Sequence, residues 1–311
     1  IICSAWVIFG TGLLLGQPYP NKPIRMVTGG TGGSSDTVSR LLAQGLTSGL
    51  GQQVIVDSRP SGVIPGQIVS AAPPDGYTLL LSSGSLWIAP LMQTTPYDAV
   101  RDFSTIALTN TAPNVLVVTP SLPVKSVTEL VALAKAKPGA LNYSTSAVGG
   151  SGHLAAELFN VMAGVHTVHI PYKAAGLALS DLMGGRVQMA FATGGSVAPH
   201  VKSGRLKALA VTSLQPSILF PELPTVAASG LPGYESITIH GLFAPAKTPA
   251  LLIIRLNQET VRFLKTPEAK ERFLNAGVEP AGTSPEEFTA RIKSEVARLQ
   301  KVIKSASIRL D

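Results

Sequence analysis

Short apolar runs alternate with stretches of helical periodicity along most of the chain. In the first cycle, apolar runs at 23–28, 52–58 and 77–83 predict strands, and a one-sided apolar pattern predicts a helix over 36–50. A second cycle predicts strands at 114–120, 141–145, 168–172, 187–193 and 206–213, with helices at 127–137, 152–164 and 175–185. This βαβ rhythm predicts an α/β fold whose parallel sheet has helices on both faces.

The rhythm changes after residue 236. Residues 237–245 form one long apolar run that predicts an extended strand. Three helices follow, and each is expected to begin at a hydroxyl cap followed by proline, at Thr248-Pro249, Thr266-Pro267 and Ser284-Pro285. Capping boxes are expected at Ser284 with Glu287 and at Ser126 with Glu129. The last helix should reach about Ser305, with an apolar stripe for core packing.

Two successive α/β cycles, followed by C-terminal helices that return to the first of them, predict two similar lobes. The expected boundaries are 19–113 plus 240–311 for the first lobe and 114–239 for the second, with the chain crossing near 112–115 and 237–240. Ligands of open α/β sheets bind outside the carboxyl ends of strands. The cleft between the lobes is therefore the expected binding place.

The loop VTGGTGGSSDTVSR, residues 27–40, has the composition of an anion-binding loop. It lacks the lysine of a triphosphate-binding P-loop, and Ser35 stands where the dinucleotide fingerprint needs its third glycine. Backbone N–H groups at a helix start and nearby hydroxyls remain as anion donors. The candidate ligand-binding residues are Thr28, Gly29, Gly30, Gly32, Gly33, Ser34, Ser35 and Asp36. The alternative is that Asp36 or Ser34 only caps the helix and the glycines only turn the chain.

A second loop repeats this design at the head of the second cycle. Residues 144–159, STSAVGGSGHLAAELF, again lead from a strand through a Ser/Gly-rich turn into a helix. Two such loops on facing lobes would hold an anion, or both ends of a dianion, between them. Further candidate ligand-binding residues are Ser83, Ser146, Gly149, Gly150, Ser151, His153, Lys173 and Thr193. A structural histidine and a solvated lysine are the alternatives at His153 and Lys173.

Composition and motifs argue against most catalytic and metal chemistry. The only cysteine is Cys3, so the chain beyond the N-terminal segment has no disulfide, zinc knuckle or cysteine nucleophile. No HExxH is present, the sequence around Ser151 lacks the last glycine of a nucleophile elbow, and His166 and His169 are expected on opposite strand faces. We therefore expect no catalytic residue, no metal and no cofactor.

The charge pattern gives little information about partners. The net charge is +7 and the sequence pI about 9.6, but the basic residues are spread along the chain, without the aromatic interleaving of nucleic-acid binders. This charge is compatible with an anionic ligand without requiring one. We expect a monomer that binds no nucleic acid.

The first residues read as a targeting segment. Residues 1–17 are uncharged and apolar but shorter than a membrane span of about 20 residues. We expect a cleaved secretory signal over residues 1–18, truncated at its start, with a retained anchor as the alternative. Cys3 precedes the apolar run and is a poor lipidation site.

From residue 19 onward the chain resembles the substrate-binding proteins of tripartite tricarboxylate transporters, the Bug receptors. The segments similar to that family, in its order, are YPNKPIRMV, GGSSDTVSRLLAQGLTSGLGQQVIVDSRP, PDGYTLLLSS, TPYDAVRDF, NVLVVTPSLPVKSVTELVALAKAKPG, HLAAELF, HIPYKAAGLALSDLMGG, PHVKSGRLKALAVTS, LPTVAASGLPGYE and GLFAPAKTP. The resemblance implies a two-lobed periplasmic-binding-protein fold of type II, the Venus flytrap. It also implies a receptor in the periplasm of a Gram-negative bacterium that delivers a small carboxylate to membrane transporter subunits, although some members serve signalling. The loops at 28–36 and 146–151 would grip the ligand carboxylate.

Three positions depart from the family pattern. Thr28 and Gly29 stand where the family has proline and a bulky aromatic residue, so a wider or more polar pocket mouth is expected. The loop at 61–66 is shorter than the glycine-rich family stretch, so the contacts of that stretch are not carried over to this chain. Ala192 stands where an acidic residue is common. We therefore expect a plain carboxylic acid as the ligand rather than an amino acid.

Overall fold

The computed structural model describes residues 19–31, 34–59, 63–145 and 148–305. The signal-peptide prediction for residues 1–18, the expectation for the loop at Ser61 and the candidates Gly32, Gly33 and Ser146 lie outside these residues. In chain order the elements are β1 (Ile24–Thr28), α1 (Ser34–Leu50), β2 (Val54–Ser58), α2 (Ile64–Ser70), β3 (Thr78–Ser83), α3 (Ser85–Ile88), η1 (Ala89–Leu91), β4 (Phe103–Val118), α4 (Val127–Ala136), β5 (Asn142–Thr145), α5 (Ser151–Ala163), β6 (Val168–Pro171), α6 (Ala175–Met183), β7 (Met189–Thr193), α7 (Gly194–Lys202), β8 (Lys207–Val211), β9 (Ile237–Pro245), α8 (Ala250–Leu264), α9 (Pro267–Asn275), β10 (Glu279–Pro280) and α10 (Pro285–Ser305).

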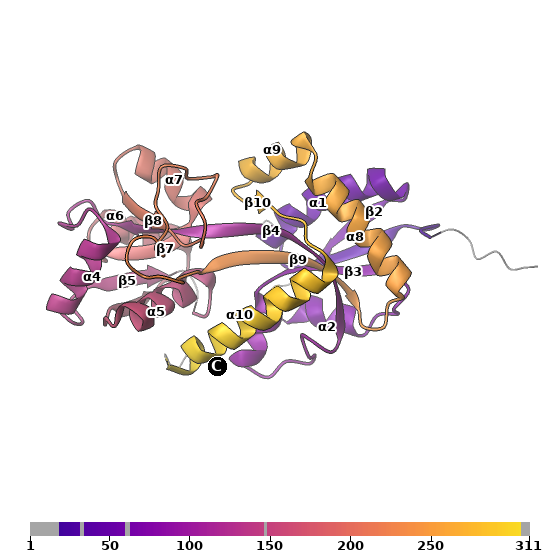
Figure 1. Cartoon of the computed structure of the whole chain (residues 1–311), viewed down its shortest axis with the longest axis horizontal. Coiled ribbons are helices and arrows are strands. Elements are labelled where there is room, and N and C mark those ends of the chain that lie inside the picture. The colour runs from indigo at the N-terminus through magenta and orange to yellow at the C-terminus, as the bar shows by residue number, and fades with distance from the viewer. Residues whose placement is uncertain (1–18, 32–33, 60–62, 146–147, 306–311) are drawn as a thin grey trace, which may run out of the picture.

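Two long strands join the two lobes. The strand order is β2-β1-β3-β9-β4-β7-β5-β6, and β8 and β10 also pair with β4. In the first lobe β1 runs parallel to β2 and β3, and β9 runs antiparallel to β3 and β4. In the second lobe β5 runs parallel to β6 and β7. Figure 1 shows β4 and β9 passing side by side from one lobe to the other. The fold is the two-lobed α/β class that the sequence predicts.

The strand β4 is much longer than the sequence pattern indicates. We expected a strand only at 114–120, whereas β4 spans 16 residues from Phe103. Pro113 and several threonines interrupt its apolar pattern. Proline is tolerated at Pro113 because the strand changes partner there: Pro113 pairs with Ile237 of β9, and Asn114 pairs with Thr193 of β7. The residue boundaries of the lobes remain a prediction.

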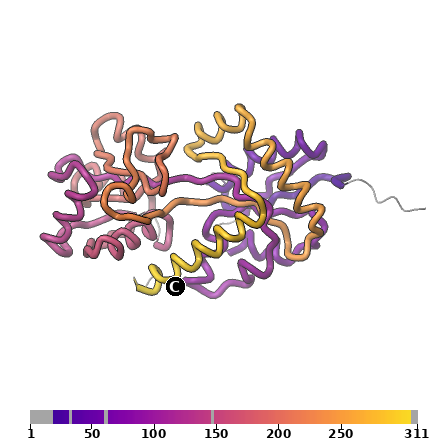
Figure 2. The backbone as a smooth tube through the Cα atoms, in the orientation of Figure 1, coloured from indigo at the N-terminus to yellow at the C-terminus, as the bar shows by residue number. Residues whose placement is uncertain are grey.

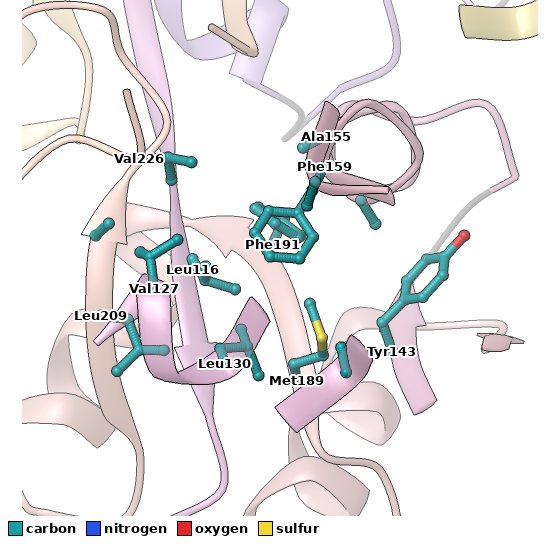
Figure 3. Close-up of a cluster of buried hydrophobic side chains, with 14 of the residues drawn as sticks. Leu116, Val127, Leu130, Tyr143, Ala155, Phe159, Met189, Phe191, Leu209 and Val226 are labelled. Atoms are coloured by element: carbon teal, nitrogen blue, oxygen red, sulfur yellow. The ribbon is translucent and has the colours of Figure 1, made fainter. Parts of the chain in front are cut away.

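Each lobe buries apolar side chains on both faces of its part of the sheet. In the second lobe one cluster lies under α4 and α5 and includes Leu116, Phe159 and Phe191 (Figure 3). The other lies under α6 and α7. In the first lobe the clusters lie under α1, α8 and α9 on one face and α2, α3 and α10 on the other. Burial on both faces explains why the strands read as continuous apolar runs rather than as alternating patterns.

The C-terminal helix α10 bridges the lobes. Phe288, near its start, packs in the first lobe with its ring 5.1 Å from that of Phe243, and Val302, near its end, belongs to the core of the second lobe. Glu295, between them, accepts a 3.0 Å hydrogen bond from the Trp87 indole, and burial raises the pKa of its carboxyl. Figures 1 and 2 show α10 running alongside the crossing strands. Helix α10 therefore contacts both lobes and the strands between them.

Most of the predicted helix starts are confirmed. Ser284 and Glu287 form a reciprocal capping box, and Thr266 caps α9. Ser126 caps α4, but Glu129 accepts from the Lys125 N–H rather than from that of Ser126. The expected cap at Thr248 is wrong: its hydroxyl donates to the Pro245 carbonyl, and α8 begins after Pro249 with no side-chain cap.

In the described part of the chain, no helix has the length and apolar character that a membrane crossing requires.

Candidate functional site

The strand pairing brings the carboxyl ends of four strands to the crossing. In the first lobe, Ser83 at the end of β3 pairs with His240 near the start of β9, and β1 runs parallel to β3. In the second lobe, Thr193 at the end of β7 pairs with Asn114, and β5 runs parallel to β7. The carboxyl ends of these strands therefore lie at the region where β4 and β9 pass between the lobes. Both Ser/Gly-rich loops predicted from the sequence begin at this region.

A pocket of about 230 Å³ lies at this edge of the second lobe. Its lining comes from β4, β5, β7 and the first turns of α5, α6 and α7: Asn114, Ser144, Thr145, Gly150, Ser151, Gly152, His153, Ala175, Ala178, Leu179, Ala190, Phe191, Ala192, Thr193 and Ser196. None of these described residues is an aspartate, glutamate, lysine or arginine. A ligand charge in this pocket would be stabilised by dipoles and neutral donors rather than by an ion pair.

The three helices that begin at the pocket have no side-chain caps. Helix α5 starts after Gly150, α6 after Ala174 and α7 after Thr193, and no side chain caps the first turn of any of them. Helices α2, α3 and α8, away from the pocket, also lack side-chain caps, so the feature of this site is that three such N-termini meet at one pocket. Uncapped N-termini offer N–H donors and the positive end of the helix dipole, which together favour an anion.

Close packing of Gly152 fixes the start of α5 against β7. A Cβ atom at this position would lie 2.3 Å from the Phe191 carbonyl oxygen, a contact that backbone atoms relieve only by moving. Glycine therefore lets the first turn of α5, which supplies Ser151 to the pocket, rest directly on the strand.

Gly152→Ala is expected to lower the free energy of unfolding by about 1–3 kcal/mol, because the added methyl overpacks a backbone contact. Urea unfolding measures this loss. Gly176→Ala, in the first turn of α6, is the matched control, since a Cβ there meets nothing within 4 Å. Equal effects of the two substitutions would contradict the assigned contact.

A row of polar side chains crosses β3, β9 and β4 in the first lobe. His240 pairs with Ser83 on one side and Asn110 on the other. Asn110 Nδ2 lies 3.1 Å from His240 Nδ1, and Ser34 Oγ lies 3.1 Å from His240 Nε2. Since an amide nitrogen only donates, Nδ1 accepts and Nε2 carries the ring proton. His240 thus donates to Ser34, which leaves the hydroxyl proton of Ser34 to bind another acceptor.

Three stacked aromatic rings lie beside the turn that precedes α5. His153 stacks on His169 at 4.1 Å, and His169 stacks on Tyr143 at 4.9 Å. The Gly149 N–H donates to His153 Nδ1 at 2.9 Å, and Tyr143 donates to Glu157. Burial lowers the pKa of His153. The neutral imidazole of His153 therefore accepts a bond that holds the turn before α5.

Stability is expected to fall as the pH drops from about 6.5 to about 4. Burial lowers the pKa of His240 to about 4, and burial and the neighbouring His153 lower that of His169 to about 4. Because the unfolded chain then binds more protons than the folded one, acid favours unfolding. The fully buried His240 alone contributes on the order of 3 kcal/mol. Unfolding curves at several pH values measure this, and His240→Gln should flatten the dependence; an unchanged slope would contradict it.

The predicted candidates fall into three groups. Gly150, Ser151, His153 and Thr193 line the pocket of the second lobe. Thr28, Gly29, Gly30, Ser34, Ser35 and Ser83 lie at the strand ends and helix start of the first lobe, and Gly149 adjoins His153. The carboxylate of Asp36 is bound by Arg40 and Ser58, and Lys173 is exposed and does not line the pocket.

The sequence interpretation missed Asn114 and Ser144. Both line the pocket, and Asn114 Nδ2 and Ser144 Oγ are buried side-chain atoms without a hydrogen-bond partner among the described residues. The available signal was their position, a polar residue next to a predicted strand end.

In the described part of the chain, no group of three or more histidine, cysteine or acidic side chains could hold a metal ion.

A two-lobed α/β fold with strand ends and helix N-termini meeting at its crossing is the architecture of the periplasmic solute-binding proteins to which the chain is similar. Residues 38–308 match the pattern of the Tripartite tricarboxylate transporter family receptor. The chain belongs to this family of receptors, and the family resemblance seen in the sequence is confirmed.

Individual relatives agree with this assignment. The chain is 37% identical over 290 residues to the UPF0065 protein in the tcbD-tcbE intergenic region of Pseudomonas sp. (strain P51), covering 92% of this chain and 86% of that protein. It is similar to the solved structure of R. palustris Rpa4515 with adipate, at 34% identity and TM-score 0.78, covering 94% and 99% of the two chains. It is also similar to the periplasmic binding protein BugD, at 30% identity and TM-score 0.74, covering 94% and 99%.

Proposed function

We propose that this receptor captures a small organic carboxylate between its lobes and delivers it to a membrane transporter of the tripartite tricarboxylate type. The observation that carries the proposal is the group of three uncapped helix N-termini around a pocket of about 230 Å³. The adipate bound to Rpa4515 is a further support, because that protein is 34% identical to this chain. The proposed location is the periplasm, with export directed by residues 1–18.

The proposed motion is a hinge closure about the two crossing strands. We propose that residues 19–113 plus 240–311 and residues 114–239 move as the two lobes, with bending near 112–115 and 237–240. The partner change of β4 at residue 114 supports this position. Closure would bring Ser34 and the first lobe toward the helix N-termini of the second lobe.

A plain carboxylic acid is the proposed ligand class. Ala192, where the family resemblance leads us to expect an acidic residue, lines the pocket, and no acidic side chain is among the described lining residues. An ammonium group would therefore find no counter-charge there. Tighter binding of aspartate or glutamate than of every plain acid, measured by calorimetry, would contradict this choice.

A thermal-shift screen against organic acids tests the proposed function. A ligand that binds only the folded state raises the melting temperature with the logarithm of its concentration above Kd, and a receptor releases the acid unchanged. A panel without any stabilising acid would contradict the proposal, and chemical conversion of a bound acid would favour the alternative of an α/β enzyme. A sensory role is the other alternative, and a neighbouring pair of transporter membrane genes would favour transport over it.

A further inference from the structure

A loop of the second lobe is hydrogen-bonded to the first lobe. This loop, residues 213–221, is called the bridging loop below, and it follows β8, which pairs with residues 115–118 of β4. Ser217 in the bridging loop donates a 2.5 Å hydrogen bond to Oε1 of Glu279 in β10, which pairs with residues 110–111 of β4. The bond therefore joins elements that are anchored to the two different halves of β4.

The bond between Ser217 and Glu279 is enclosed by protein. Ser217 is 2% exposed, and its hydroxyl also accepts a 3.2 Å hydrogen bond from the Leu219 N–H, which leaves its own proton for the carboxylate. A hydroxyl that donates to a charged oxygen away from water forms a stronger bond than an exposed neutral pair. The contact is therefore strong enough to affect how the two lobes move.

The bridging loop also packs against the start of α7 at the pocket. A Cβ atom at Gly194, the first residue of α7, would lie 2.4 Å from the Phe220 ring. Thr193 and Ser196, next to this contact, line the pocket of the second lobe. The bridging loop thus contacts a helix start at the pocket through Phe220 and the other lobe through Ser217.

The bridging loop and helix α10 connect the lobes on opposite faces of the sheet. Phe220 packs against the apolar cluster under α6 and α7, whereas Val302 of α10 belongs to the cluster on the other face. Figure 1 shows α7 and α9 on one side of the crossing strands and α10 on the other. The lobes also come close at Gly277, after α9, where a Cβ atom would lie 3.8 Å from the Gly195 backbone of α7. Bending of the crossing strands that separates α7 from α9 would therefore break the bond between the bridging loop and β10.

We propose that the hydrogen bond between Ser217 and Glu279 is a latch that holds the two lobes closed and slows the dissociation of a captured ligand. This inference rests on the proposed hinge closure and adds to it the contact that stabilises the closed form. Because a hydrogen bond weakens steeply once donor and acceptor move beyond about 3.2 Å, a small opening is enough to break it. Both partners belong to the protein, so the latch acts on the retention of every ligand alike.

Distances between spin labels on the ligand-free full chain test the latch. Cys3→Ser removes the only cysteine, and Lys202→Cys on α7 and Glu271→Cys on α9 place labels at exposed positions on the two lobes. Ser217→Ala removes the bond and keeps the charge of Glu279. It is expected to raise the ratio of open to closed molecules about tenfold, because a bond to a charged acceptor is lost. Ser180→Ala, at an exposed serine of α6, is the control and should leave the ratio unchanged.

A second measurement follows the dissociation of adipate, the acid bound to the similar Rpa4515. Stopped-flow dilution should show dissociation about tenfold faster from the Ser217→Ala variant than from the unmodified protein. Glu279→Ala should act similarly, and the double variant should be no faster than either single one, since all three lack the same bond. Adipate binding with equal dissociation rates in all variants would contradict the latch and leave the proposed receptor function intact.

The ligand-free distances decide the inference without any ligand. An unchanged ratio of open to closed molecules in the Ser217→Ala variant would overturn the latch. Failure of adipate to bind would count against the proposed function, while the latch would still be decided by these distances. If Ser217→Ala fails to fold, Glu279→Gln replaces the charged acceptor by a neutral one and should raise the ratio by about threefold; no rise in that variant would overturn the latch equally.

Discussion

Replacing Ser34 and Ser151 together by leucine is expected to abolish ligand binding while the protein stays folded. His240 holds Ser34 as a donor, and Ser151 begins α5 at the pocket. Each hydroxyl bond to a charged oxygen is worth about 1.5–3 kcal/mol, so the loss of both weakens binding roughly a hundredfold to ten-thousandfold. Calorimetry with the tightest-binding acid of the screen measures the loss.

A control double variant separates this effect from general damage. Ser48→Leu with Ser203→Leu changes one exposed serine in each lobe, and neither residue lines the pocket of the second lobe. Both double variants should stay folded, because none of the four serines is buried. The Ser34/Ser151 variant should be less stable by about 1–3 kcal/mol, because leucine removes the partner of His240 Nε2. Wild-type affinity in the Ser34/Ser151 variant would contradict the proposed assignment of these residues to the ligand site.

Phe288→Ala is expected to cost about 3–5 kcal/mol of stability, the largest effect of any single substitution considered. The ring is fully buried, lies 5.1 Å from Phe243 and 6.2 Å from Trp87, and fills the space above Gly241, where a Cβ atom would come within 2.0 Å of it. Alanine would leave a cavity between α10 and β9 that rigid neighbours cannot close. Urea or guanidinium unfolding measures the change in free energy.

Leu251→Ala is the control for Phe288→Ala. Leu251 on α8 is 79% exposed, so its truncation removes apolar atoms without opening a cavity and should stay within about 0.5 kcal/mol. Phe288→Leu should fall between the two because it retains most of the buried volume. A loss below about 1 kcal/mol for Phe288→Ala would show that α10 can repack over β9, contrary to the tight contact at Gly241.

Periodicity predicted the regular parts of the fold well. The strand at 237–245 and the helix ending at Ser305 match β9 and α10, because both have long uninterrupted patterns. The first half of β4 was missed because threonines, Asn110 and Pro113 break its apolar run. Those polar residues have partners that lie far away in the sequence: Asn110, for example, contacts His240 through a pairing that sequence periodicity does not contain.

The candidate site was predictable only in part. Glycines and hydroxyls mark the loops after β1 and β5, since few other compositions let a backbone approach an anion. Asn114 and Ser144 have no comparable local signature, because an asparagine or serine at a strand end is usually solvated or paired. The lack of a partner at Asn114 Nδ2 and Ser144 Oγ emerges only when β4, β5 and β7 are brought together.

The hydrogen bond between Trp87 and Glu295 couples the fluorescence of Trp87 to the position of helix α10. The sequence has two tryptophans, and Trp6 lies in the proposed signal segment, so the exported chain would emit from Trp87 alone. This indole bonds to the middle of the helix that touches both lobes, within a buried cluster of aromatic rings. Any sliding of α10 during closure would alter the polarity around one fluorophore. Under the proposed closure, ligand binding would therefore change the intrinsic emission of the unlabelled protein.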